Sequence, residues 1–176
     1  LNPQVDSIPM SDGRKLAADV YIPQGMSSGP VILIQTPYNR LLYRLNLPLG
    51  VGLNLNNSNY IFVIADWRGF YGSAAAAYVG APSLGKDGAS AVEWIYQQSW
   101  CNGKIGTWGP SALGRVQFQT AKENPPHLSC ICPLVAAPYY DYDEYYPNGD
   151  LRTEYVQQLN GLGFGIGPVL MQHPVK

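Results

Sequence analysis

The chain has 176 residues, enough for one domain with a hydrophobic core and too few for two ordinary domains. Hydrophobic residues make up 46% of the chain, which excludes a disordered protein. The net charge of −1 excludes a strongly positive surface of the kind that binds nucleic acids or anionic membranes. No apolar run approaches the roughly 18 residues of a membrane span, so neither nucleic-acid binding nor membrane spanning is expected.

Composition also bears on compartment and on metal or cofactor binding. Charged residues make up only 13%, whereas Tyr, Gly and Pro number 13, 19 and 15, a balance that leans towards a secreted protein. The chain starts at Leu1 without an initiator methionine, so a processed chain, an excised piece or a partly observed one is expected. Cys101, Cys130 and Cys132 lack the spacing of a metal site, and we expect all three to be buried as small hydrophobic residues. The sequence predicts no metal and no cofactor.

The chain predicts strands and helices in alternation. In chain order these are strands at residues 5–9, 15–23, 31–34 and 60–65, a helix at 87–98, a strand at 104–108, a helix at 112–123 and a strand at 129–135. Residues 41–59 combine many leucines with Pro48, Gly50 and Gly52, so a clean helix throughout is not expected, and residues 66–83 are loop-like.

Local signals define the boundaries and the class of this pattern. The pair Asp12-Gly13 predicts a turn between the first two strands, and Asp87 is expected to cap the first helix. The apolar runs, that at 129–135 included, are typical of strands buried in a parallel sheet. We therefore predict an α/β fold, with a mostly parallel sheet and helices on both faces.

The character of the chain changes near its C-terminal end. We divide it into residues 1–138, the predicted α/β domain, and residues 139–176, a tail that starts a cap-like segment or forms an interaction region. The tyrosines of residues 139–146 fit either a binding surface or a cap packed on the rim of the sheet.

An acidic cluster lies within the same tyrosine-rich stretch. Asp141, Asp143 and Glu144 carry carboxylates that could bind calcium, but Tyr146 stands where a calcium loop needs glycine. We therefore expect a solvated acidic turn here.

The most informative motif is Gly109-Pro110-Ser111-Ala112-Leu113-Gly114, between a predicted strand and a predicted helix. A serine on such a sharp turn needs small neighbours, because the backbone reverses tightly and holds the serine under strain. Its hydroxyl then stands at the edge of the sheet, beside the free amides that begin the helix. The alternative is an ordinary strand-to-helix turn with Ser111 as N-cap.

Several further blocks occur in a characteristic order. They are residues 8–21 (IPMSDGRKLAADVY), 36–40 (TPYNR), 66–73 (DWRGFYGS), 86–88 (KDG), 92–95 (VEWI), 100–106 (WCNGKIG) and 125–128 (PPHL). Together with the serine motif they resemble the X-Pro dipeptidyl-peptidase and cocaine-esterase (CocE/NonD-type) group of α/β-hydrolases, over roughly residues 5–138.

The resemblance implies roles for individual residues. Ser111 matches the nucleophile, and Tyr38 matches the tyrosine whose hydroxyl joins a backbone amide in the oxyanion hole. That amide is here the one of Ala112, where the family usually has tyrosine. Asp66 and Arg68 match a motif interpreted as structural, which braces the loop beside the nucleophile. We therefore expect the side chains of Ser111 and Tyr38 within reach of one small bound group.

The same resemblance shows what the sequence lacks. In this fold the catalytic acid and histidine follow the nucleophile on loops after later strands, and this chain stops about where the family's cap begins. His127 is expected to be structural, since it lies at the far end of the last predicted strand from Ser111. His173 stands four residues from the end with no predicted strand to deliver it, and Asp141, Asp143 and Asp150 are candidate acids only by default.

Two functions remain open. The first is hydrolysis of a small acyl ester or an X-Pro peptide by Ser111 through an acyl-enzyme. The second is a catalytically incomplete hydrolase fold that serves as a structural or self-assembling protein. Without further strands, residues 129–135 become an apolar edge, so we expect self-association or a further C-terminal polypeptide to cover it.

Overall fold

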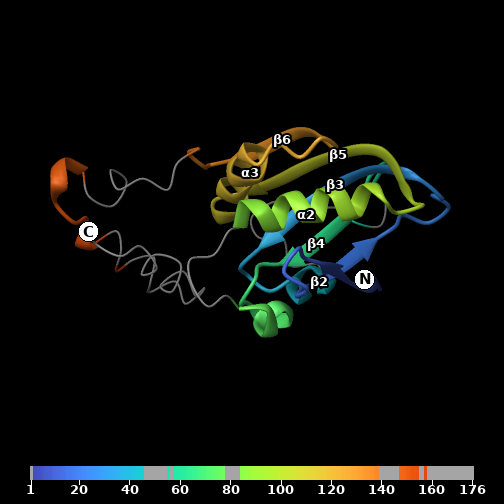
Figure 1. Ribbon diagram of the computed structural model, residues 1–176, viewed down its shortest axis with the longest axis horizontal. Coiled ribbons are helices and arrows are strands. Elements are labelled where there is room, and N and C mark those ends of the chain that lie inside the picture. The colour runs from blue at the N-terminus through green and yellow to red at the C-terminus, as the bar shows by residue number, and fades with distance from the viewer. Residues whose placement is uncertain are drawn as a thin grey trace.

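A computed structural model describes residues 2–45, 55, 58–77, 84–138, 147–154 and 157. Their core is a six-stranded sheet in the order β1-β2-β4-β3-β5-β6 (Figure 1). The strands are β1 Gln4–Pro9, β2 Lys15–Tyr21, β3 Gly29–Thr36, β4 Ile61–Asp66, β5 Cys101–Pro110 and β6 Leu128–Leu134. The helices are α1 Leu41–Arg44, α2 Leu84–Tyr96 and α3 Ala112–Lys122, with 3-10 turns at η1 Tyr71–Ala76 and η2 Pro147–Gly149.

The sheet joins an antiparallel hairpin to a parallel block. Strand β1 pairs with β2 in antiparallel fashion around the turn at Gly13, whose φ is 80°, and β2 also pairs antiparallel with β4. Strands β4, β3, β5 and β6 run parallel. The predicted α/β class and the mostly parallel sheet are confirmed.

Both faces of the central strands are buried. In β3, Val31 and Leu33 pack in one cluster with residues of α2, whereas Ile34 packs in a second cluster with Tyr43 of α1. Figure 1 shows α2 and α3 together in front of the sheet, so α1 covers part of the opposite face. Because side chains on both faces of β3 are buried, the strand is a continuous apolar run.

Asp87 does not cap α2, contrary to the sequence prediction. The helix begins three residues earlier, at Leu84, and Asp87 is a buried residue of its first turn. Its carboxylate instead accepts hydrogen bonds from Arg68. An aspartate near a helix start is compatible with both an N-cap and a buried ion pair, so the local sequence could not distinguish these two roles of Asp87.

Strand β6 is not buried, so the prediction of a buried strand at residues 129–135 was wrong. The prediction that all three cysteines are buried was wrong as well. β6 is the edge strand, and each of its residues is half-buried or exposed because no strand of the described residues pairs with its outer side. Cys130 and Cys132 are exposed free thiols, and Cys101 is half-buried. An apolar run resembles a central strand even where it forms an edge.

The remaining expectations concern segments that are described only in part. Most of residues 41–59 lie outside the described residues, apart from α1 and a few positions after it. The division at residue 138 stays a prediction, since most of residues 139–176 lie outside the described part. Among the residues that the structure describes, none of the helices is both long and apolar enough for a membrane span.

Candidate active site

Ser111 lies on a sharp turn between the end of β5 and the start of α3, as the sequence predicts. Its φ of 55° and ψ of −122° are a rare conformation for a residue with a side chain, and they carry strain. The backbone amide of Ser111 donates to the carbonyl of Leu134 at 2.9 Å, which ties the turn to the end of β6. The side chain is exposed and makes no capping hydrogen bond, so the interpretation of Ser111 as an ordinary N-cap is wrong.

The glycines of the motif allow this turn to form. A Cβ on Gly109, whose φ is 150°, would collide with the Leu113 side chain. A Cβ on Gly114 would lie 2.6 Å from Cβ of Ala136 and 2.9 Å from the Gly109 carbonyl oxygen. Both positions exclude any larger residue, so the Gly-x-Ser-x-x-Gly spacing has a packing cause.

Tyr38 lies beside Ser111 because β3 and β5 are parallel neighbours, whose following loops emerge at the same edge of the sheet. The Tyr38 ring is 9% exposed and packs in one cluster with Leu113. Its hydroxyl group is hydrogen-bonded to the Ser111 side chain and to the backbone amide of Ala112. The three predicted site residues therefore meet at one place.

The environment keeps the Tyr38 phenol protonated. Burial raises the pKa of Tyr38 above its usual value, and the contacts with Ser111, the Arg115 charge and the Ala112 amide offset only part of that effect. A neutral phenol can donate a hydrogen bond to a developing negative charge. Arg115 lies one helical turn after Ser111, whose carbonyl accepts from the Arg115 amide at 2.9 Å.

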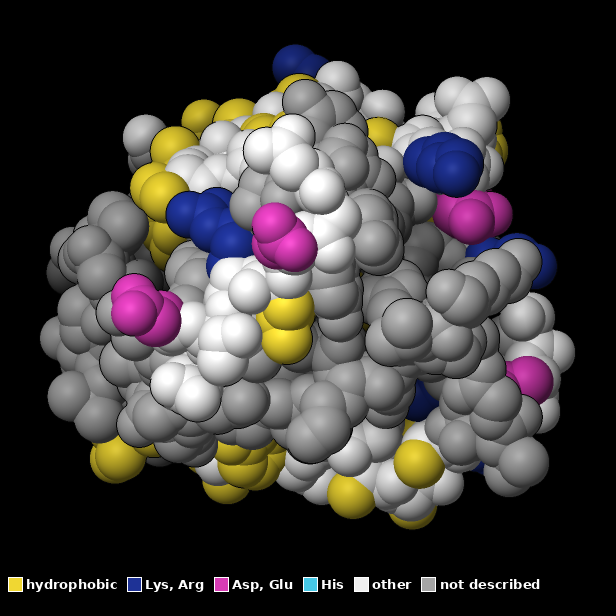
Figure 2. All heavy atoms as spheres, turned by 90° about the vertical axis from the view of Figure 1, so that its left-hand side faces the viewer, with side chains coloured by type: hydrophobic (Ala, Val, Ile, Leu, Met, Phe, Trp, Pro, Cys, Tyr) yellow, Lys and Arg dark blue, Asp and Glu magenta, His cyan; other side chains and the backbone are white. Residues whose placement is uncertain are grey.

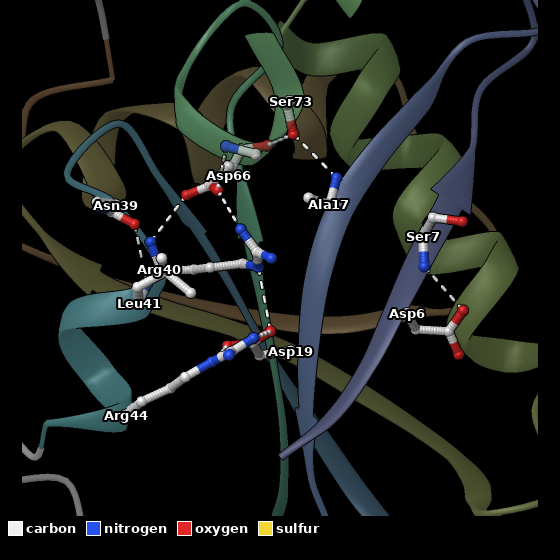
Figure 3. Close-up of polar contacts among 11 residues, drawn as sticks. Asp6, Ser7, Ala17, Asp19, Asn39, Arg40, Leu41, Arg44, Asp66 and Ser73 are labelled. Atoms are coloured by element: carbon white, nitrogen blue, oxygen red, sulfur yellow. Dashed lines mark hydrogen bonds and ion pairs between the residues drawn. The ribbon is translucent and has the colours of Figure 1, made fainter. Parts of the chain in front are cut away.

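The turn that carries Tyr38 is fixed by side chains on either side. The Tyr38 amide donates to Thr36 Oγ1 at 3.0 Å, and the Leu41 amide donates to Asn39 Oδ1 at 3.0 Å. Asn39 itself adopts a left-handed φ of 71°. The next amide, that of Arg40, donates to Asp66 Oδ1 at 2.8 Å, and Figure 3 shows this carboxylate facing the turn.

A buried ionic network underlies the same turn. Arg40 Nη1 lies 2.7 Å from Asp66 Oδ2, and Arg40 Nε lies 3.1 Å from Asp19 Oδ1 (Figure 3). Arg44 contacts Asp19 with both Nε and Nη2, each at 2.6 Å. Sequence reasoning missed Asp19, Arg40 and Arg44. The available signal was a single acidic residue within the apolar run of β2, which requires a partner if it is buried.

Asp66 and Arg68, predicted to brace one loop, act at different places. Asp66 contacts the Tyr38 turn as described, and its Oδ2 also accepts from the Gly72 amide at 3.1 Å. Arg68 instead bonds Asp87 at 2.6 Å and Asp12 at 2.8 Å. It thereby ties the first hairpin to α2.

His127 lies at the other end of the sheet from Ser111. It precedes β6, which starts opposite Ile105 of β5, whereas Ser111 follows the end of β5. His127 Nδ1 lies 2.7 Å from Glu93 Oε2, and the ring stacks on Tyr96 at a centroid distance of 3.4 Å. His173, Asp141 and Asp143 lie outside the described residues, and Asp150 is exposed.

Metal-ligating side chains do not cluster in the part of the chain that the structure describes. No group of three or more His, Cys, Asp or Glu within the described ranges is arranged to hold a metal ion. Figure 2 views the side at which α3 begins, where the described basic, acidic and apolar side chains are interspersed. The groups observed at Ser111 are its own hydroxyl, the Tyr38 hydroxyl and the Ala112 amide.

Comparisons with known proteins agree with this geometry. A family model described as X-Pro dipeptidyl-peptidase (S15 family) matches residues 12–171. Cocaine esterase of Rhodococcus sp. (strain MB1 Bresler) is 33% identical over 149 residues, which cover 84% of this chain and 26% of the esterase.

Solved structures give the same result. A CocE/NonD family hydrolase from Staphylococcus aureus superposes with a TM-score of 0.58 at 30% identity, over 72% of this chain and 26% of that chain. An alpha-amino acid ester hydrolase superposes with a TM-score of 0.64 at 25% identity, over 76% of this chain and 25% of that chain. The resemblance expected from the sequence motifs is confirmed, and the chain spans about a quarter of the length of these relatives.

Proposed function

This chain belongs to the X-Pro dipeptidyl-peptidase (S15) family, and from that premise we propose that it carries the nucleophile and oxyanion hole of a serine hydrolase. The observation that carries the proposal is the strained Ser111, whose side chain is hydrogen-bonded to the Tyr38 hydroxyl, which in turn is hydrogen-bonded to the Ala112 amide. A serine on a strand-to-helix turn with two converging donors is the arrangement that acyl transfer requires.

In the proposed reaction, Ser111 Oγ attacks the carbonyl carbon of the substrate and loses its proton to a general base. The carbonyl oxygen becomes negatively charged, and the Ala112 amide and the Tyr38 hydroxyl donate hydrogen bonds to it. The C–O or C–N bond then breaks, and the leaving group takes up a proton. Water hydrolyses the resulting acyl-enzyme and regenerates Ser111.

The proposed substrate is a small acyl ester, with an X-Pro peptide as the alternative. Support for the ester comes from relatives whose names specify ester hydrolysis, cocaine esterase and alpha-amino acid ester hydrolase. Support for the peptide comes from the family description. Neither reaction needs a cofactor, since a hydroxyl nucleophile, a base and two donors suffice.

A second candidate is a catalytically inactive, hydrolase-derived protein with a structural or self-assembling role. It is favoured by the distance between Ser111 and His127, which lie at opposite ends of the sheet. Without a histidine as general base, turnover is lower by about four to six orders of magnitude. The exposed edge strand β6, with Val135 91% exposed just after it, is the surface through which copies would associate.

Labelling with a fluorophosphonate separates these candidates. In the full-length gene product we expect one label per chain, on Ser111, and none in Ser111→Ala. Ester turnover should disappear in the same variant. A folded full-length protein that neither reacts nor turns over esters supports the structural role.

The same reagent tests His173. We expect the isolated 176-residue chain to label slowly, because a general base is not among its described residues near Ser111. Rapid stoichiometric labelling that His173→Ala abolishes would assign the base to that histidine.

A further inference from the structure

The turn that carries Tyr38 ends on a residue held through both its backbone and its side chain. The Arg40 amide donates to Asp66 Oδ1 at 2.8 Å, and the Arg40 guanidinium lies 2.7 Å from Oδ2 of the same carboxylate. Asp66 ends β4, so its position is set by the sheet. One carboxylate therefore fixes both ends of Arg40, two residues after Tyr38.

A second carboxylate fixes the direction of the Arg40 side chain. Asp19 Oδ1 accepts from Arg40 Nε at 3.1 Å, and the Arg44 guanidinium lies on the other side of Asp19 (Figure 3). Asp19 and Asp66 are both 0% exposed and Arg40 is 8% exposed. Two cations and two anions thus balance within one cluster, in which the two aspartates and Arg40 are buried and Arg44 is half-buried.

The Arg40 guanidinium packs closely against the backbone of Gly72. A Cβ on Gly72 would collide with Arg40 Nη1 and would lie 3.1 Å from Asp66 Oδ2. The contacts also require a planar fork, because Nε serves one aspartate and Nη1 the other. Lysine has a single ammonium group and cannot reproduce both bonds in this geometry.

We propose that Arg40 is a positioning residue, which holds the Tyr38 hydroxyl where it meets Ser111 and the Ala112 amide. This inference rests on the proposed function of Tyr38. The path is short: Asp66 and Asp19 fix Arg40, Arg40 fixes the end of the turn, and the left-handed Asn39 transmits that position to Tyr38. A hydrogen-bond donor displaced by about 1 Å loses much of its effect on the transition state, on the order of 100-fold in rate.

A purely structural role is the alternative, and the chain offers a matched control for it. Arg68 is equally buried and contacts two carboxylates, Asp87 and Asp12, besides the Ala76 carbonyl. Those three contacts lie on the first hairpin, α2 and η1, and not on the Tyr38 turn. Loss of Arg68 should therefore lower stability without moving Tyr38.

The test is a double-mutant cycle in the full-length gene product, with ester turnover measured per folded molecule. We expect Arg40→Met to lower kcat about 10- to 100-fold with KM within about twofold, as for loss of a contact made in the transition state. Arg68→Met should leave kcat unchanged. In a Tyr38→Phe background, Arg40→Met should cause no further loss, because the group that it positions is already absent.

Different outcomes contradict different statements. Additive losses in the cycle, or an equal loss of kcat in Arg68→Met, would overturn the positioning role of Arg40 alone. Full activity of Tyr38→Phe would refute the proposed role of Tyr38 and this inference with it. If Arg40→Met does not fold, Asp19→Asn takes its place in the cycle. Asp19 orients the same guanidinium, and asparagine replaces its carboxylate with an uncharged group of nearly the same shape.

A second readout does not depend on turnover. With fluorotyrosine placed at position 38, the ¹⁹F resonance should shift in Arg40→Met or Asp19→Asn and stay in place in Arg68→Met. An unchanged resonance in both variants of the Arg40 cluster would overturn the proposal.

Discussion

At the scale of single residues, the site depends on backbone positions that few residue types tolerate. Ser111 holds a left-handed φ because β5 must turn directly into α3, and Gly109 and Gly114 remove the side chains that would obstruct this turn. Ser111 keeps its strained backbone conformation because the surrounding packing and the hydrogen bond from its amide to the Leu134 carbonyl hold it there. The reactive hydroxyl is thereby presented at the edge of the sheet.

Replacement of Gly109 tests this requirement. Gly109→Ala should lower the free energy of unfolding by about 2–4 kcal/mol, because the new Cβ meets Leu113 in addition to the strained φ. Gly13→Ala is the matched control, since Gly13 has a φ of 80° but no neighbour within 4 Å of the added Cβ. It should cost only about 1 kcal/mol. Urea unfolding measures both, and equal losses would show that the contact with Leu113 contributes nothing.

At the scale of elements, three tyrosines pack together against the face of the sheet that α1 covers. Tyr21 ends β2, Tyr43 lies in α1 and Tyr38 follows β3. Burial is the main cause that raises the pKa of all three phenols. The folded state thus favours the protonated phenols, whereas the unfolded chain releases these protons near pH 10.

The sign of the resulting pH dependence follows from proton binding. Above about pH 10 the unfolded state binds fewer protons than the folded state, so stability is fully present below that pH and falls as the pH rises. Each buried phenol contributes a slope of about 1.4 kcal/mol per pH unit. Tyr43→Phe should make the decline between pH 10 and 11 shallower by about that amount in urea unfolding. An unchanged slope would contradict burial of the Tyr43 phenol as its cause.

Substitution of Arg68 tests how much its ion pairs between the first hairpin and α2 contribute to stability. Arg68→Met removes the Arg68 ion pair of the 4%-exposed Asp87, which should cost about 3–5 kcal/mol in urea unfolding. Arg14→Met changes a half-exposed arginine of the same hairpin and should cost much less. The further change Asp87→Asn should restore part of the loss, because it removes the buried negative charge that Arg68 pairs with. No recovery would mean that packing, and not charge, determines the effect.

The sequence predicted the features that depend on residues close together in the chain. It missed the features that depend on residues far apart in the chain. The apolar run of β3 and the glycines around Ser111 each determine their structure within a few residues. The partners of Asp87 and of Asp19 lie far away in the chain, so neither the pair with Arg68 nor the Arg40 cluster could be derived from local pattern. The exposure of β6 depends on which strand stands beside it. The meeting of Tyr38 and Ser111 was predicted from the local strand–turn–helix pattern and the family resemblance, and its physical basis is that the parallel neighbours β3 and β5 deliver their following loops to one edge.

At the scale of the whole molecule, the sheet ends in two unlike edges. Strand β1 forms one edge and lies in an antiparallel hairpin, while β6 forms the other and continues a parallel block. Leu134 is 39% exposed and Val135 is 91% exposed at the end of β6. An edge with exposed apolar side chains favours pairing with another strand, and 13% charged residues give little repulsion to oppose it.

We therefore predict that the isolated 176-residue chain associates with itself through β6. Light scattering should give a mass well above the 19.3 kDa of one chain. The double variant Leu134→Lys/Val135→Lys should shift the mass towards the monomer, because charges on an edge strand oppose pairing. Val5→Lys is the matched control, since Val5 is 61% exposed on β1 at the opposite edge. If Val5→Lys dissociates the assembly and the β6 variant does not, the contact lies at β1; a soluble monomer of the unaltered chain would show that some other part of the chain covers the β6 edge.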